Sequence, residues 1–169
     1  MPKYNQVKQA LSHEAIKQVY NLYRNSVNSV YIDDHWCDRF APLLVGKAML
    51  AKYTPEEFDF VWQEVKPHIE EKMGNAELIY SRIIKYNPGC YIQNHVDGVI
   101  YTNKQKHNLS VIIAITDQKD YRGGEMFIDG DYIEQELGDI LFYGYDVPHE
   151  IKPIKTGIRY VINLRCQVG

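Results

Sequence analysis

From Glu77 to its end, the chain reads as short strands separated by polar turns, and this pattern limits the fold more than any other feature. The apolar and β-branched stretches that we expect to be strands are Leu78–Tyr86, Cys90–Val96, Leu109–Thr116, Met126–Ile128, Tyr132–Glu136, Ile140–Tyr143 and Ile158–Leu164. Turn signals such as Asn87-Pro88-Gly89 and Gly130-Asp131 lie between them. Many short strands with polar turns favour an all-β sandwich or barrel over a parallel α/β sheet.

The first 75 residues carry two helical patterns. Apolar residues recur at helical spacing from about Ser12 to Asn25, and Ser12 is a good N-cap. Thr54-Pro55-Glu56-Glu57 is typical of a second helix start, Pro67 is expected to kink or divide that helix, and Gly74 is expected to end it. The apolar stripe of this helix is Phe58, Val61, Trp62, Val65 and Ile69.

Val30–Ala51, between the helices, has no regular spacing and reads as a surface loop or, alternatively, a substrate-facing lid. Tyr101–His107 reads as a solvated polar loop. We expect one domain, 1–169, in which residues 1–75 are mainly helical support and loop and residues 76–169 form the β core that carries the site.

The composition also limits which partners and which cellular compartment we expect for this chain. A net charge of −3 without a basic stripe argues against nucleic acid, and no apolar run approaches the ~20 residues that span a bilayer. The Met1-Pro2-Lys3-Tyr4 start has no signal-peptide pattern. Three scattered cysteines, without a CxxC pair, favour a reducing compartment. We therefore expect a cytoplasmic protein.

The candidate metal ligands lie on the expected strand Tyr91–Asp97. Alternate side chains of a strand share a face, so His95 and Asp97 should point the same way, with Tyr91 and Gln93 beside them. His149 is the best third ligand, and two histidines with one carboxylate form the facial triad of non-haem Fe(II) oxygenases. Singly, each histidine is more often an ordinary core or surface residue, and the aspartate a turn residue. The nearest rival ligand is His107, in a polar loop without a paired residue.

Arg159 follows His149 by ten residues, inside the strand-like Ile158–Leu164. It shares one strand face with Val161, Asn163 and Arg165, while the other face is apolar and should pack against the helices. A charged group facing the mouth of a barrel requires an anion, and a planar guanidinium suits bidentate binding of a carboxylate. The alternative is a structural salt bridge.

Together, these residues closely resemble the prolyl 4-hydroxylase-type branch of the Fe(II)/2-oxoglutarate dioxygenases. The resemblance covers roughly Leu78 to Cys166, about half the chain, and its motifs occur in the expected order. These are Tyr86-Asn87-Pro88-Gly89, His95-Val96-Asp97, Asn108-Leu109-Ser110, Asp120-Tyr121-Arg122-Gly123-Gly124-Glu125, Gly138-Asp139-Ile140-Leu141-Phe142, His149 and Arg159. It implies a mainly β protein, a double-stranded β-helix (jelly roll) core braced by N-terminal helices.

The same resemblance implies the cofactors. Fe(II) would be held by His95, Asp97 and His149, with 2-oxoglutarate and O2 as co-substrates and ascorbate as an expected stimulant. The distal carboxylate of 2-oxoglutarate would bind Arg159. Tyr86 and Tyr91 are expected to supply hydroxyls near the co-substrate and the iron, although each could be a core aromatic.

Two positions depart from the family pattern. Ala114 stands where a tyrosine commonly shares the distal carboxylate with the arginine, and Ser110, four residues earlier on the same strand face, is expected to replace it. Asn163 is a further expected cofactor contact. Arg165 stands where an aromatic or apolar residue is frequent, and is expected to contact either an acidic or polar substrate group or a neighbouring carboxylate.

The implied activity is hydroxylation of a residue, expected to be proline, in a peptide or protein, with release of succinate and CO2. No catalytic residue beyond the metal centre is expected. A free amino acid or other small metabolite is an alternative substrate. A non-catalytic, cupin-like metal-binding or sensor protein is a third reading, against which Arg159 argues because a plain metal site does not need it. A peptide or protein is the expected partner, without nucleic acid or membrane, and the oligomeric state stays open.

Overall fold

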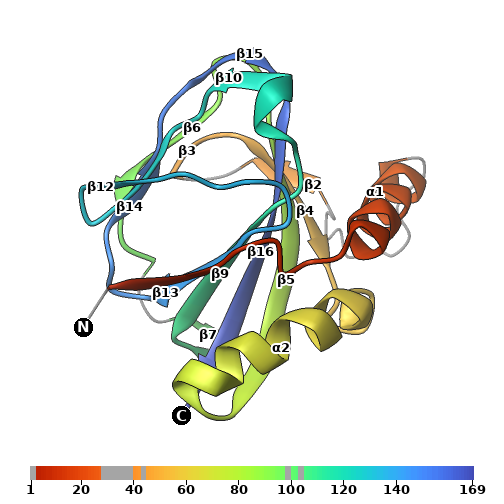
Figure 1. The fold of residues 1–169 in the computed structure, drawn as a ribbon, viewed down its shortest axis with the longest axis vertical. Coiled ribbons are helices and arrows are strands. Elements are labelled where there is room, and N and C mark those ends of the chain that lie inside the picture. Colours follow the sequence, from red (N-terminus) through yellow and green to blue (C-terminus); the bar gives the residue numbers. More distant parts are fainter. Residues whose placement is uncertain (1–2, 28–39, 43–44, 98–99, 103–104) are drawn as a thin grey trace.

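The computed structural model describes residues 3–27, 40–42, 45–97, 100–102 and 105–169. Within these residues two antiparallel sheets face each other, and two helices cover the outer face of the larger sheet (Figure 1). The helices are α1 (His13–Val27) and α2 (Asp59–Met73), with a short 3-10 turn at Gln118–Asp120. The chain therefore folds as expected, into a jelly roll of mainly β structure braced by N-terminal helices.

The larger sheet has seven strands in the described part of the chain. In spatial order they are β1 (Tyr4–Val7), β13 (Ile140–Gly144), β9 (Leu109–Ala114), β16 (Arg159–Val168), β5 (Ala76–Tyr86), β4 (Met49–Tyr53) and β2 (Phe40–Pro42). The smaller sheet runs β12 (Asp131–Ile133), β11 (Met126–Ile128), β14 (His149–Ile151), β6 (Tyr91–His95) and β3 (Gly46–Lys47). Two further pairs are β10 (Tyr121–Gly123) with β15 (Ile154–Gly157), and β7 (Ile100–Thr102) with β8 (Gln105–His107).

Strand β16 separates two apolar cores. Ile162 and Leu164 face the helices, where they pack with residues such as Val19. Val161 faces the space between the sheets, in a second core. The predicted two faces of β16 are thereby confirmed, except that Ile158 precedes the strand and is 39% exposed.

The helix signals are mostly confirmed. The hydroxyl oxygen of Ser12 accepts a hydrogen bond from the Ala15 amide at 3.1 Å. Thr54 and Glu57 exchange reciprocal side-chain to backbone bonds of 3.0 and 3.1 Å, but α2 begins only at Asp59, with Phe58 as its N-cap, so the predicted start is four residues early. Pro67, however, does not divide α2, because a proline removes one backbone hydrogen bond while the buried stripe still holds the helix on the core. Gly74 ends it with a φ of +81°.

Both expected loops contain strands. β2 and β3 fall inside Val30–Ala51 and β4 begins there, so the surface-loop interpretation is wrong for these parts, while Tyr31–Asp38 lies outside the described residues. β7 and β8 pair as a hairpin within the expected polar loop, with Ile100 opposite His107. Residues 1–75 therefore supply sheet strands as well as helices. No helix among the described residues is both long and apolar enough to span a membrane.

Candidate functional site

Strands β6 and β14 lie side by side in the smaller sheet, and their pairing sets His95 opposite His149. The register then shifts, because Ile92 and not Gln93 pairs with Ile151, so one extra residue of β6 bulges. Ile92 and His95 consequently both face the space between the sheets. The prediction that Tyr91 and Gln93 lie beside His95 is wrong, since both are exposed.

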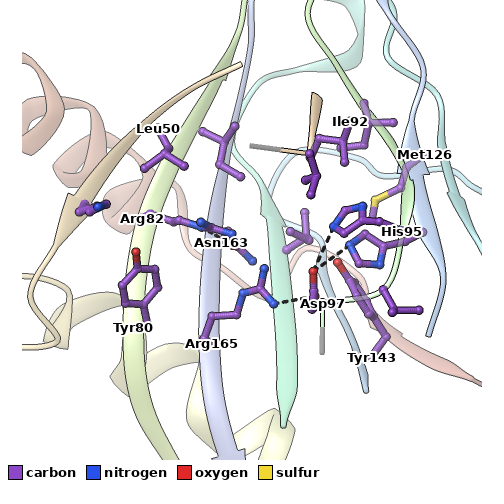
Figure 2. A pocket seen from close by; sticks show the side chains of 17 residues that line it. Leu50, Tyr80, Arg82, Ile92, His95, Asp97, Met126, Tyr143, Asn163 and Arg165 are labelled. Carbon is purple, nitrogen blue, oxygen red and sulfur yellow. Dashed lines mark hydrogen bonds and ion pairs between the residues drawn. The ribbon is translucent and has the colours of Figure 1, made fainter. Parts of the chain in front are cut away.

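The three candidate ligands form one cluster, as the sequence predicts (Figure 2). Asp97 follows the end of β6, and its Oδ1 lies 3.2 Å from His95 Nε2 and 3.4 Å from His149 Nε2. Ligand atoms about 2.1 Å from a common ion and at right angles lie ~3 Å apart. The distances from Asp97 to both histidines are therefore those of neighbouring ligands on one ion, and all three ligand atoms lie within 4.8 Å of one another. His107, the rival ligand, is buried on β8 and does not belong to this cluster.

Backbone carbonyls fix the orientation of both histidines. Nδ1 of His95 lies 2.8 Å from the Gln93 carbonyl oxygen, and Nδ1 of His149 lies 3.0 Å from that of Val147. A carbonyl oxygen only accepts, so Nδ1 carries a hydrogen in each ring, and Nε2, the atom nearest Asp97, is the nitrogen able to bind a metal. This donor set fits a divalent iron ion.

The second oxygen of Asp97 is held by the larger sheet. Oδ2 accepts hydrogen bonds from Arg165 Nη1 and Ser110 Oγ, both at 2.6 Å. Burial would raise the pKa of Asp97, but the two histidines and the Arg165 guanidinium together hold that pKa well below its usual range. Asp97 therefore offers a metal one oxygen, Oδ1. Of the two expectations for Arg165, the structure supports contact with a neighbouring carboxylate.

The expected role of Ser110 is wrong. β9 runs antiparallel to β16, which sets Ser110 opposite Arg165 and Ala114 opposite Val161. Four residues of a strand cover ~13 Å, so Ser110 lies at the Asp97 end and not beside Arg159. Asn163 faces the pocket, but its amide is engaged within the protein: Oδ1 accepts from Arg82 Nε at 2.6 Å, and Nδ2 donates to the Val111 carbonyl.

Arg159 is buried and has no carboxylate within ion-pair distance among the described residues. Its Nη2 donates to Gln135 Oε1 at 3.2 Å, and the guanidinium lies 5.5 Å from the centroid of the Tyr86 ring. Three buried donors in this group have no partner in the described part of the chain: Arg159 Nη1, Gln135 Nε2 and the Tyr86 hydroxyl. Unpaired buried donors are costly, and the neighbouring groups of Arg159 and Gln135 are of the type that binds a carboxylate. The structural salt bridge expected as the alternative is absent from these residues.

A small cavity of about 200 Å³ reaches this group. Arg159, Gln135, Tyr121 and Gly124 line it, and Met126 lines both this cavity and the larger pocket that holds the metal ligands. Tyr86 is fully buried with its ring beside Arg159 but lines neither cavity, so its hydroxyl near the co-substrate stays a prediction. Tyr91 is 37% exposed and lines neither cavity, so its expected role is wrong.

Sequence reasoning missed two polar residues of the site. Gln135 lies in a polar segment after β12, where no periodicity marks a buried glutamine. Arg82 could have been found, because it lies four residues before Tyr86 and shares its strand face. Arg82 lines the larger pocket, whose volume is about 490 Å³ (Figure 2).

Comparison with known proteins matches residues 81–164, about half of the chain, to the 2OG-Fe(II) oxygenase superfamily. The chain belongs to this superfamily. The match begins at the strand that carries Arg82 and ends just before Arg165, so it includes the three ligands and Arg159.

Relatives of the oxygenase agree in sequence and fold. A PKHD-type hydroxylase of Paraburkholderia xenovorans (strain LB400) is 31% identical over 83 residues, which are 44% of this chain and 37% of the relative. The chain thus spans well under half of that relative's length. The crystal structure of a viral collagen prolyl hydroxylase from Paramecium Bursaria Chlorella virus-1 has a TM-score of 0.71 at 13% identity, covering 98% of this chain and 96% of that one. An α-ketoglutarate-dependent epimerase from nogalamycin biosynthesis has a TM-score of 0.72 at 13% identity, covering 98% and 78%. The shared fold therefore does not select the substrate.

Proposed function

We propose that this protein is an Fe(II)/2-oxoglutarate-dependent dioxygenase that hydroxylates a prolyl residue in a peptide or protein. The observation that carries the proposal is the pairing of two features: a facial triad with one oxygen offered by Asp97, and a buried guanidinium, Arg159, without an anion in the described residues. A plain metal-binding protein would need the first feature only.

In this proposal His95, Asp97 and His149 hold Fe(II), and Arg159 binds the distal carboxylate of 2-oxoglutarate. Gln135 and Tyr86 supply the further donors to that carboxylate, in place of the tyrosine that Ala114 lacks. With iron, 2-oxoglutarate and O2 bound, such a centre supplies an oxidant that hydroxylates an unactivated C–H bond, releasing succinate and CO2. Arg165 and Ser110 keep Asp97 in place during this chemistry, because they bind the oxygen that faces away from the histidines.

The prolyl substrate is supported by resemblance: the chain is similar to PKHD-type hydroxylases and shares its fold with a collagen prolyl hydroxylase. The pocket volume of about 490 Å³ lies in the usual range for small-ligand sites, so a single side chain of a peptide fits beside the iron.

Anaerobic spectroscopy tests the metal and co-substrate sites. Fe(II) plus 2-oxoglutarate should give a visible charge-transfer band, because the keto acid chelates the iron directly. Asp97→Ala and His149→Ala should abolish the band, whereas His68→Ala on α2, which removes a histidine outside the cluster, should keep it. A normal band in both ligand variants would contradict the triad.

Affinity for 2-oxoglutarate tests the second cavity. Removing one partner of a buried charge pair costs ~2–5 kcal/mol, so Arg159→Ala should weaken 2-oxoglutarate binding roughly 30- to 5000-fold. Gln135→Leu removes one neutral donor, and we expect a smaller loss of about 10-fold. Unchanged affinity in both variants would show that Arg159 serves another partner.

Succinate release tests the substrate. Blocked prolyl peptides should stimulate succinate formation and gain one oxygen by mass, whereas free proline should do neither. Efficient turnover of free amino acids, without turnover of peptides, would overturn the peptide assignment and leave the oxygenase assignment intact.

A further inference from the structure

The pocket wall opposite the metal ligands is cationic. Lys52, Arg82 and Arg165 line the pocket, and Asp97 is its one carboxylate among the described residues. Backbone pairing explains the grouping, because Lys52 on β4 lies opposite Arg82 on β5, and Arg82 lies opposite Asn163 on β16. Directly opposite residues of neighbouring strands project from the same face of the sheet. We call Lys52, Tyr80 and Arg82 the β4–β5 wall.

The two arginines differ in their partners. Arg165 is paired with Asp97, at 2.6 Å. Arg82 donates from Nε to the neutral amide of Asn163, and its guanidinium lies 5.6 Å from the centroid of the Tyr80 ring. Arg82 has no carboxylate within ion-pair distance in the described part of the chain. Among these residues, Arg82 therefore lacks a paired carboxylate inside the pocket.

The pKa of Arg82 also indicates that the pocket destabilises the charged form of this side chain. Burial, followed by repulsion from Arg165, lowers the pKa of Arg82 to about 10. A lowered arginine pKa means that the charged form is destabilised by its surroundings, and a bound anion would relieve this. The guanidinium stays charged at neutral pH, since pH 7 lies below that pKa.

Iron and 2-oxoglutarate do not supply that anion in the proposed site. The keto-acid end of 2-oxoglutarate would bind at the metal, and its distal carboxylate would bind Arg159, which lies six residues from Arg165 along β16 and in the other cavity. The pocket lining also includes aliphatic side chains, among them Leu50, Ile84 and Ile112. The space beside the metal therefore suits a ligand with one acidic group and an apolar part.

We propose that the β4–β5 wall binds a carboxylate of the substrate through Arg82, so that the oxidised carbon lies next to an acidic group. This inference rests on the proposed function, because it takes the metal pocket as the place of oxidation. The carboxylate comes either from an Asp or Glu beside the target residue of a peptide or from a small free acid, and the same chemistry recognises both. Arg82 acts as the specificity residue, with Tyr80 behind its guanidinium and Lys52 beside it.

The test measures binding to the anaerobic protein loaded with Fe(II) and 2-oxoglutarate. The probes are acetylated and amidated prolyl tripeptides with glutamate or glutamine beside proline, together with N-acetylglutamate and N-acetylglutamine as free small molecules. We expect the glutamate probe of at least one pair to bind about 10- to 100-fold more tightly than its glutamine partner, the range for a hydrogen bond to a charged group. The pair that shows this preference identifies the source of the carboxylate.

Two variants make the test specific. Arg82→Gln should remove the preference, with 2-oxoglutarate affinity kept within about twofold. Lys85→Gln removes a positive charge from the same strand, three residues away and on the helix-facing side, and should keep the preference. Equal binding of glutamate and glutamine probes, or no binding of glutamate probes at millimolar concentration, would overturn the proposal.

A parallel loss of 2-oxoglutarate affinity in Arg82→Gln would also overturn it, since Arg82 would then serve the co-substrate. The charge-transfer band recorded in the same samples separates this failure from failure of the proposed function. A missing band in the wild-type protein would indicate that the oxygenase assignment is wrong, whatever the probes do.

Discussion

At the scale of single residues, the central feature is that the two carboxylate oxygens of Asp97 have different partners. One oxygen faces two histidine Nε2 atoms, and the other is bound by Arg165 and Ser110. Outer partners of this kind orient metal ligands and commonly change metal affinity 10- to 100-fold when removed. Arg165 is thus a positioning residue that acts through Asp97.

Arg165→Met should weaken Fe(II) binding about 10- to 100-fold, because Asp97 loses the charge that holds its carboxylate. Ser110→Ala removes a single neutral hydrogen bond and should have a smaller effect. Metal titration measures the affinity, and the electronic spectrum of the Co(II)-substituted protein reports ligand geometry, which a merely destabilised fold would not alter. Unchanged metal affinity and spectrum in Arg165→Met would contradict the positioning role.

The place of a residue in the site could be predicted from the sequence where a motif fixes both the spacing and the chemistry of its residues. His95, Asp97, His149 and Arg159 belong to such a pattern, and the structure brings the three ligands together. Ser110 and Tyr91 could not be placed correctly, because their positions depend on the register between strands and on a bulge. Neither leaves a signal in one sequence, since both follow from how the strands pair in space.

At the scale of elements, the turn at Gly123-Gly124 lies against the aliphatic part of the Arg159 side chain. Gly124 has a φ of +71°, and a Cβ there would lie 2.4 Å from Ile154 Cδ1 and 3.6 Å from Arg159 Cδ. The positive φ therefore favours glycine, and a Cβ would in addition require the end of the Ile154 side chain to shift. Gly130, in the tight β11–β12 turn, has a φ of +85° and open space around the Cβ position.

Gly124→Ala should destabilise the protein by about 1–3 kcal/mol and also weaken 2-oxoglutarate binding, because the Ile154 side chain must shift and the new methyl group lies in the cavity that Arg159 lines. Gly130→Ala carries the backbone strain alone and should leave 2-oxoglutarate affinity unchanged. Chemical denaturation measures the first effect and calorimetric titration the second. Equal 2-oxoglutarate affinity in the two variants would show that Arg159 does not depend on this turn.

Elements with strong patterns could be predicted, and so could the three-residue strand β11, whereas several other short strands could not. β9 is buried at every position and β16 alternates between two cores, so their sequences carry clear signals. β14 has three residues and follows a turn at Pro148, and it exists through pairing with β6 and β11. β1 to β4 are similarly short and are formed by tertiary pairing more than by local propensity.

At the scale of the whole molecule, the sites for iron and co-substrate join both sheets. His95 and His149 come from the smaller sheet, whereas Arg165 and Arg159 come from β16 of the larger one. A ligand that bridges the two sheets should stabilise the folded state as a whole.

Mn(II), a redox-inert stand-in for Fe(II), and 2-oxoglutarate should therefore raise the free energy of unfolding by ~2.7 kcal/mol for each ligand present at 100 times its Kd. The Arg159→Ala variant should lose most of the stabilisation by 2-oxoglutarate and keep the stabilisation by Mn(II). The Asp97→Ala variant should lose both. Thermal denaturation with each ligand alone and with both measures the two parts. Full 2-oxoglutarate stabilisation in Asp97→Ala would argue against a shared site.

Because Arg159 and Arg165 lie on one strand, only certain insertions and deletions between them are compatible with both sites. β16 is hydrogen-bonded on both sides, to β5 and β9, so it cannot slide without breaking both ladders. Inserting a single residue between the two arginines would turn one of them toward the helices, since successive side chains alternate between faces. Only insertions or deletions of two residues keep both arginines on the same face of β16. Each such change displaces one guanidinium by roughly 7 Å along the strand. Length variation should thus be tolerated in the turns around β16 and excluded within it.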